Sequence, residues 1–241
     1  LDSAGDDPGT MASVTGTEDE VRAALLGCKD VVLANLNSPR QMVISGTTKG
    51  IDTAEEMLKA KGIVTRRFPV ACAFHSPVIE GADARFAQAI ENEVLGEMQI
   101  PVWSNTTAQP HENAASVRKA MAEHLVSPVR FVEQVEEMYA SGARTFVECG
   151  PGRVQTGLVS KILGDRPHRV VTTEVPGEPA ITSWLRAIAS LFGSGVHIEP
   201  SRLFASRHCR RVDLSQSKQA DTKSMSRWWV NGQTAWPENG P

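Results

Sequence analysis

The order of secondary-structure signals in the first third of the chain constrains its fold most. Stretches at 10–16, 30–36, 40–46 and 63–74 have the β-branched content or the alternation of strands. Helical patterns lie after the first and the third stretch. Each carries a capping box, in which a threonine and a glutamate three residues later satisfy free amides of the first turn: Thr17 with Glu20, and Thr53 with Glu56. The order βαββαβ predicts the split βαβ, or ferredoxin-like, motif over residues 11–72.

From His75 onward the pattern becomes an alternation of strands and longer helices. We expect helices at about 77–95, 114–125, 128–141, 153–164 and 179–195, and strands at 99–107, 144–152 and 168–174. Such alternation is typical of a parallel sheet covered by helices. The last helix would present one apolar face, formed by Trp184, Leu185, Ile188 and Phe192. Residues 73–200 are therefore expected to be an α/β unit.

The two ends of the chain and its composition limit which classes of protein it can belong to. Residues 1–10 form a polar loop and residues 201–241 a polar, basic tail, so the chain looks like a piece of a longer protein. The net charge is −3, and no apolar run approaches the roughly 20 residues of a membrane span. Neither a nucleic acid nor a membrane is therefore indicated as a partner. The four cysteines lack disulfide or metal spacing, which favours reduced thiols in a cytoplasmic protein.

His75 is the most informative single residue, in the stretch VACAFHSP (70–77). Ser76 is a good helix N-cap and Pro77 a good first helical residue, so His75 should lie just outside a helix N-terminus. The partial positive charge there disfavours imidazolium, and a neutral imidazole can take a proton from a hydroxyl or thiol. The preceding strand would deliver it to a sheet edge, where open α/β folds bind ligands. The alternative is a partly buried histidine that stabilises a turn.

Four motifs together resemble one family over most of the chain. AFHSP, NLNSPRQMVISG, SPVRFVEQVEEM and FVECGPGRVQTGLV occur with the order and spacing of acyltransferase domains of type I polyketide synthases, and they are similar to malonyl-CoA:acyl-carrier-protein transacylases. The resemblance implies an α/β-hydrolase-like acyltransferase subdomain with an inserted ferredoxin-like subdomain. It also implies that the tail, residues 201–241, is a post-acyltransferase linker, in which Trp228, Trp229 and Trp236 would be packing anchors.

The resemblance further implies a serine–histidine mechanism. A serine in a G-H-S-x-G turn takes an acyl group from acyl-CoA and passes it to the phosphopantetheine thiol of an acyl carrier protein. His75 would be the general base, first for the serine and then for the thiol. The family orients this histidine by a main-chain carbonyl four residues before the proline of SPV. Here that residue is His124, where the family usually has Asn or Gln.

The printed sequence departs from the family in one respect, because it contains no G-x-S-x-G. The family's nucleophile and its carboxylate-binding arginine lie upstream of the inserted subdomain. We therefore expect three partners: the upstream part of the same acyltransferase domain, an acyl carrier protein and a neighbouring ketosynthase domain. The missing serine also supports a competing function, that of a non-catalytic binding or scaffold module of a multidomain synthase.

Phe74 is the residue that the resemblance ties to substrate choice. In this family AFHS accompanies malonyl units and ASHS methylmalonyl units, and a phenyl ring would fill the space that a 2-methyl group needs. Asn105 and the NLNSPRQ turn are possible pocket residues, although turn formation by Asn explains them equally well. No permanently bound cofactor is expected, only acyl-CoA as substrate and carrier-protein phosphopantetheine as acceptor.

Three other candidate sites are weaker. Cys72 and His75 stand three apart, which on an extended strand puts them on opposite faces. Cys149 precedes a glycine turn and a helix, but the glycines are explained by tight turning. GPGRVQTG lacks the lysine and the spacing of a phosphate loop. The remaining histidines have no ligand spacing, so no metal site is expected.

Overall fold

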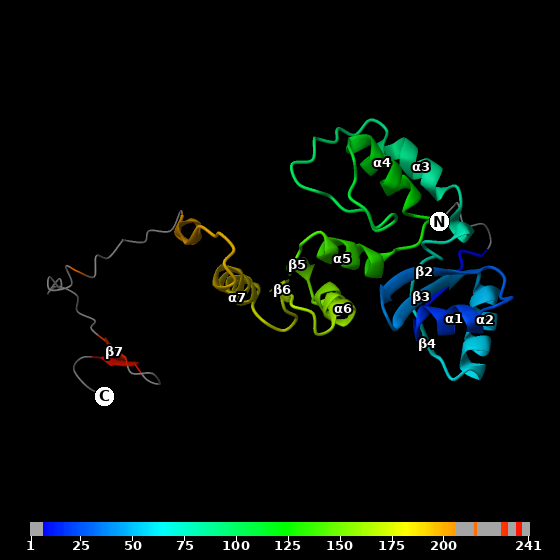
Figure 1. The fold of residues 1–241 in the computed structure, drawn as a ribbon, viewed down its shortest axis with the longest axis horizontal. Helices are drawn as coiled ribbons and strands as arrows, with labels where there is room; N and C mark the ends of the chain where they lie inside the picture. The colour runs from blue at the N-terminus through cyan, green and yellow to red at the C-terminus, as the bar shows by residue number, and fades with distance from the viewer. Residues whose placement is uncertain (1–6, 206–214, 216–227, 231–234, 238–241) are drawn as a thin grey trace. The chain divides into compact units, whose positions relative to one another are not determined.

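The structure is a computed structural model that describes residues 7–205, Ser215, 228–230 and 235–237. The chain divides into two compact units, Leu1–Val196 and His197–Pro241 (Figure 1). Within the described residues, no helix is both long and apolar enough to cross a bilayer. The first unit contains the predicted βαββαβ segment and the strands and helices that follow it.

The first six elements of unit one follow the predicted order. They are β1 (Thr10–Thr15), α1 (Glu18–Ala24), β2 (Val31–Ser38), β3 (Gln41–Gly46), α2 (Thr48–Ala60) and β4 (Val64–Arg67). The strands form one sheet in the order β2-β3-β1-β4, and every neighbouring pair is antiparallel. Figure 1 shows α1 and α2 lying together against this sheet.

Side-chain alternation explains why the sheet is covered on both faces. Ala12 and Val14 of β1 are fully buried in the core with α1 and α2, whereas Met11 is buried in a second cluster. Because successive strand residues point to opposite faces, these clusters lie on opposite sides of the sheet. The helices complete the larger cluster with Val21 and with residues spaced three or four apart on α2: Ile51, Ala54 and Leu58. Full burial of such an aliphatic side chain contributes roughly 1.5–3 kcal/mol.

The two helix starts test the capping predictions separately. The predicted box at α1 is confirmed, since the Thr17 side chain accepts from the Glu20 amide and the Glu20 carboxylate accepts from the Thr17 amide. The box predicted at Thr53 is wrong. The cap of α2 is Thr47, which accepts from the Gly50 amide, and Thr53 lies inside the helix, where its hydroxyl donates to the Lys49 carbonyl four residues back.

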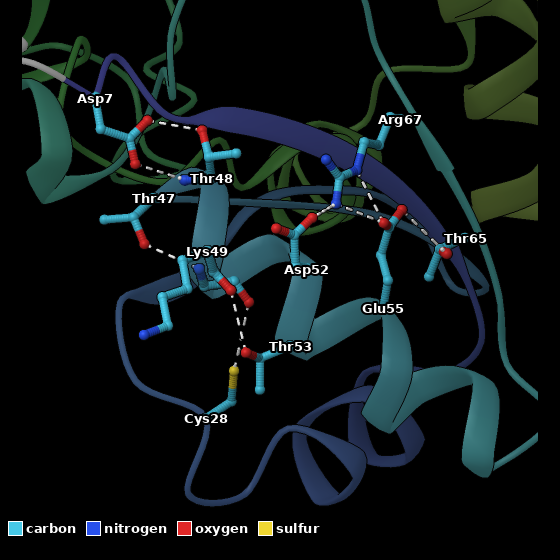
Figure 2. A network of polar contacts seen from close by, with 11 residues as sticks. Asp7, Cys28, Thr47, Thr48, Lys49, Asp52, Thr53, Glu55, Thr65 and Arg67 are labelled. Atoms are coloured by element: carbon cyan, nitrogen blue, oxygen red, sulfur yellow. Dashed lines mark hydrogen bonds and ion pairs between the residues drawn. The ribbon is translucent and has the colours of Figure 1, made fainter.

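A polar network, shown in Figure 2, fastens α2 to the segments on either side of it. Asp7 accepts from the Thr48 amide at 2.9 Å and from its hydroxyl at 2.7 Å, and these bonds lower the pKa of the Asp7 carboxyl. Arg67 of β4 is bound to Asp52 and Glu55 of α2, which raises the pKa of its guanidinium. The network therefore fixes α2 against the chain before β1 and against the edge strand.

The chain between β4 and the next long helix differs from the prediction. The strand predicted over 63–74 ends at Arg67. After the Phe68 amide donates to the Met11 carbonyl, Pro69 offers no amide to continue the ladder. The helix predicted over 77–95 is interrupted. A short 3₁₀ turn, η1 (Pro77–Ile79), is separated from α3 (Ala82–Ile90) by Gly81, whose left-handed φ of 92° no helix can contain.

The rest of unit one alternates as expected, with one exception. The strand predicted over 99–107 is irregular and keeps a single bridge between Trp103 and Pro110. The other elements are α4 (Ala114–Glu123), α5 (Phe131–Ala140), β5 (Thr145–Pro151), α6 (Val154–Leu163), β6 (Arg169–Glu174) and α7 (Ala180–Gly193). Strands β5 and β6 pair in parallel, and α6 connects them and packs with α5 around Val135, Val159 and Leu163.

The final helix of unit one buries a different face from the one predicted. Helix α7 contacts β6, and its buried residues are Ser183 and Ala187. Of the predicted apolar face, Trp184 is 48% and Phe192 59% exposed. Small residues let the helix approach the strand closely, so the bulky side chains that give the helix its amphipathic pattern lie on the other side.

Unit two contributes η2 (Pro200–Phe204) and a short hairpin of β7 (Trp228–Val230) and β8 (Ala235–Pro237). Trp229 pairs with Trp236 in this antiparallel hairpin. The tryptophans predicted as packing anchors therefore have a described backbone, whereas their side chains and Cys209 lie outside what the structure describes. The post-acyltransferase linker at residues 201–241 remains a prediction.

Candidate functional site

Two segments that are distant in sequence meet at His75. On one side, the Ala73 amide donates to the Pro8 carbonyl at 2.8 Å. On the other, Val129 is bound to the outer edge of β2, with its amide donating to Ala34 at 2.8 Å and its carbonyl accepting from Leu36 at 2.9 Å. The chain just before β1 therefore holds the segment of His75, and the edge strand β2 holds the segment that follows α4.

The local turn at His75 is the one that the sequence predicts. Ser76 is the N-cap of η1: its buried hydroxyl accepts from the Val78 amide at 3.3 Å and donates to the Ala73 carbonyl at 2.7 Å. His75 itself has a φ of 59°, in the left-handed region that few residues other than glycine adopt. Its amide donates to the Leu125 carbonyl at 2.9 Å, which stabilises this conformation. Backbone strain of this kind is concentrated at functional sites.

The His75 imidazole is oriented by main-chain carbonyls. Its Nδ1 lies 2.8 Å from the carbonyl oxygen of His124 and 3.2 Å from that of Ser127. Carbonyl oxygens only accept, so Nδ1 carries the proton and Nε2 keeps its lone pair in the neutral ring. The structure thus brings His75 and the predicted His124 carbonyl together, and it adds the Ser127 carbonyl, for which the sequence contains no signal.

The long helix from which the sequence argues for a neutral His75 does not form. The turn after Ser76, η1, has three residues and supplies almost no dipole. The His75 ring instead faces the C-terminal end of α4, whose C-cap is His124. The main-chain carbonyls at that end carry partial negative charge, and His75 binds those of His124 and Leu125.

The side chain of His124 also takes part in the site. Its ring centroid lies 4.9 Å from that of His75, and the two ring planes differ by 33°. The Nε2 atom of His124 is buried and has no hydrogen-bond partner. Burial first, and the nearby His75 charge second, lower the pKa of the His124 imidazole. The sequence predicts a role only for the carbonyl of this residue, and no pattern in the sequence indicates the contact between the rings.

The two other predicted site residues occupy different surroundings. Phe74 is adjacent to His75 in the chain and 38% exposed. Asn105 lines a cavity of about 560 Å³ together with Asn35 and Asn37 of β2, and its carbonyl accepts from the Arg130 amide at 2.7 Å. Neither His75 nor Phe74 lines that cavity, so the described residues do not join Asn105 to the histidine.

The weaker candidates find no support in the geometry. Cys72 is buried, its burial raises the pKa of the thiol, and no bond joins it to His75. Cys149 lies exposed on β5. At the would-be phosphate loop, the Glu148 carboxylate already accepts from the Gln155 and Thr156 amides at the start of α6, where a phosphate would bind. No group of three metal-ligating side chains exists among the described residues.

Comparison with known proteins gives concordant matches. The family of acyl transferase domains matches residues 3–178. A malonyl CoA-acyl carrier protein transacylase of Bacillus subtilis is 37% identical over 164 residues, which are 64% of this chain and 50% of that protein. A putative inactive phenolphthiocerol synthesis polyketide synthase type I of Mycobacterium tuberculosis is 32% identical over 206 residues, which are 86% of this chain and 13% of that protein.

Among solved structures, the acyltransferase domain from the second module of the salinomycin polyketide synthase matches with a TM-score of 0.73 and 30% identity, over 83% of this chain and 47% of that one. The malonyl CoA-acyl carrier protein transacylase of Coxiella burnetii gives a TM-score of 0.70 at 31% identity, over 79% and 60% of the two chains. This chain thus spans half the length of the Bacillus relative and a smaller part of the synthase.

Proposed function

This chain belongs to the family of acyl transferase domains, and on that premise we propose that it is part of an enzyme that moves a malonyl unit from malonyl-CoA to the phosphopantetheine thiol of an acyl carrier protein. The observation that carries the proposal is the orientation of His75, whose Nδ1 is held by two carbonyls while Nε2 is left with a lone pair. A base arranged in this way suits acyl transfer through a covalent intermediate.

In the proposed reaction a serine outside this chain is the nucleophile. Nε2 of His75 takes the proton of the serine hydroxyl while the oxygen attacks the thioester carbonyl. The tetrahedral intermediate collapses, the C–S bond breaks, and the proton returns from His75 to the CoA sulfur. In the second half Nε2 takes the proton of the phosphopantetheine thiol, whose sulfur attacks the malonyl ester, and the proton then goes to the departing serine oxygen. The carbonyls of His124 and Ser127 stabilise the imidazolium in both halves.

The proposal assigns a role to each part of the chain. Residues 11–72, with their βαββαβ order, would be the ferredoxin-like subdomain inserted into an α/β-hydrolase-like subdomain, of which residues 73–200 are the C-terminal part. Strand β5 pairs only with β6 among the described residues, so a strand of the upstream part of the domain would extend the sheet there. The acyl carrier protein and the neighbouring ketosynthase domain complete the proposed set of partners.

The proposal is tested with the chain alone and with the chain joined to the part of its parent protein that carries G-H-S-x-G. We expect a malonyl adduct, by intact-mass measurement after malonyl-CoA treatment, on the joined protein and none on the isolated chain. A stable adduct on the isolated chain would show that the nucleophile is misassigned. No transfer by the joined protein would favour the scaffold function instead.

A further inference from the structure

The contact between the imidazoles of His75 and His124 takes no part in the proton transfers of the proposed reaction. In the described part of the chain, only two buried side-chain polar atoms lack a partner, and Nε2 of His124 is one of them. A buried polar atom without a hydrogen bond costs free energy, so its retention calls for an explanation. The ring that carries this atom lies 4.9 Å from the ring of the proposed base.

The surroundings keep the His124 ring neutral. Residues that flank both histidines form a small apolar cluster, made of Cys72, Ile79, Leu125 and Val126 with Ala82. Burial and the neighbouring His75 act in the same direction on His124, against its protonation. The other charged side chains of α4, of α3 and of the turn after η1 make no hydrogen bond or ion pair with either ring: Glu80, Asp83, Arg85, Glu91, Arg118, Lys119 and Glu123.

We propose that the His124 imidazole is a positioning residue for His75: a neutral, flat surface against which the base lies, so that Nδ1 stays on the two carbonyls and Nε2 alone accepts protons. This inference rests on the proposed function. The ring contact opposes rotation of the His75 ring away from the carbonyls. The neutrality of His124 matters because a second positive charge at this distance would oppose formation of the His75 imidazolium in both half-reactions.

Three variants of residue 124 distinguish the role of its ring from that of its carbonyl, because each of them changes the side chain and keeps the main chain. His124→Phe keeps a flat ring without nitrogen, whereas His124→Ala and His124→Asn remove the ring. The first measurement uses the chain as printed: the ¹⁵N spectrum of the His75 imidazole at pH 7.5 reports the fraction of the Nδ1–H tautomer. We expect one dominant Nδ1–H tautomer in the wild type and in His124→Phe, and a mixture of tautomers in His124→Ala and His124→Asn.

The second measurement is malonyl transfer by the joined protein. We expect His124→Ala to lower kcat by roughly 3- to 10-fold, the range that an aromatic pair contributes, with KM unchanged. His124→Phe should restore most of the rate. The inference is wrong if removal of the His124 ring leaves both the His75 tautomer and kcat unchanged. It is also wrong if a folded His124→Phe protein loses as much of its kcat as His124→Ala. If the wild-type protein transfers no malonyl, the proposed function fails, but the tautomer measurement still decides the positioning role.

Discussion

At the scale of single residues, the site is built from main-chain atoms. His75 receives its orientation from the carbonyls of His124 and Ser127 and its backbone conformation from that of Leu125. A carbonyl is available from any residue type, so the hydrogen bond that it accepts from His75 does not depend on the side chain of residue 124. The identity of residue 124 is therefore free to serve a second purpose, namely the contact between the rings.

Phe74 gives a residue-scale prediction about substrate choice. The phenyl ring next to His75 should exclude a 2-methyl branch, so Phe74→Ser in the joined protein should raise the methylmalonyl-to-malonyl ratio of kcat/KM by roughly 10- to 200-fold, the range for one methyl group in an apolar pocket. Competition between the two CoA esters, read by mass spectrometry of the carrier protein, measures the ratio. An unchanged ratio would mean that Phe74 does not line the acyl pocket.

Glu148 gives a second residue-scale prediction, with a defined dependence on pH. Burial favours its neutral acid, but the hydrogen bonds from the Thr156 and Gln155 amides prevail and lower the pKa of the carboxyl. The folded state therefore holds this proton less tightly than the unfolded state, so the stabilisation is present above the unfolded pKa and is lost as the pH falls through the folded value. At pH 7, Glu148→Gln should cost roughly 0.3–1 kcal/mol.

Urea denaturation of both proteins between pH 7 and pH 3 measures this difference. The difference in free energy of unfolding between the wild type and Glu148→Gln should shrink as the pH falls. Protonation of Glu148 removes the negative charge that the variant lacks. A difference that stays constant with pH would show that the carboxylate charge does not stabilise the start of α6.

At the scale of elements, the caps and breaks of helices decide where the sequence analysis succeeds. The order of β1 to β4 and the start of α1 were predictable because alternation and the box at Thr17 are local signals. The start of α2 was predicted at Thr53 because Glu56 follows it with the spacing of a capping box, but Thr47 also offers a hydroxyl as a cap. Only the fold, in which the end of β3 leads directly into Thr47, selects between them.

Thr47 and Thr53 form a matched pair for testing the revised start of α2. Thr47→Ala removes the acceptor of the Gly50 amide and should lower the free energy of unfolding by roughly 1 kcal/mol. Thr53→Ala lies within the helix and should change stability little, because alanine has the better helix propensity and only a bond to the Lys49 carbonyl is lost. Thermal and urea unfolding compare them. An equal or larger loss of stability in Thr53→Ala would indicate that Thr53, and not Thr47, caps α2.

Other elements were beyond local reasoning for physical reasons. The helix predicted from Pro77 ends after three residues, because Glu80 has an extended ψ of 138° and Gly81 then adopts a left-handed φ. That interruption also removed the dipole argument for His75. The meeting of His75 with residues 124 to 127 spans about 50 positions in the chain, and no periodicity contains such a contact. The resemblance located this contact, whereas the Ser127 carbonyl and the neighbouring His124 ring were found only in the structure.

At the scale of the whole molecule, the described residues contain an oriented histidine and a parallel pair of strands, β5 and β6. Strand β5 has β6 as its neighbour in the described residues, and the chain matches about half of its bacterial relative. In the proposed reaction, this chain therefore supplies the base, and another part of the domain supplies the nucleophile. We expect no malonyl transfer by His75 without the serine, and only very slow transfer by the serine without His75.

The rate of malonyl transfer by the joined protein, wild type against His75→Ala, tests this claim most directly. The variant removes Nε2 but keeps the Ser76 cap, so its unfolding curve should match that of the wild type. Loss of general-base catalysis should lower kcat by roughly 10²- to 10⁴-fold. A folded His75→Ala protein that transfers malonyl to the carrier protein at a near-normal rate would contradict the account.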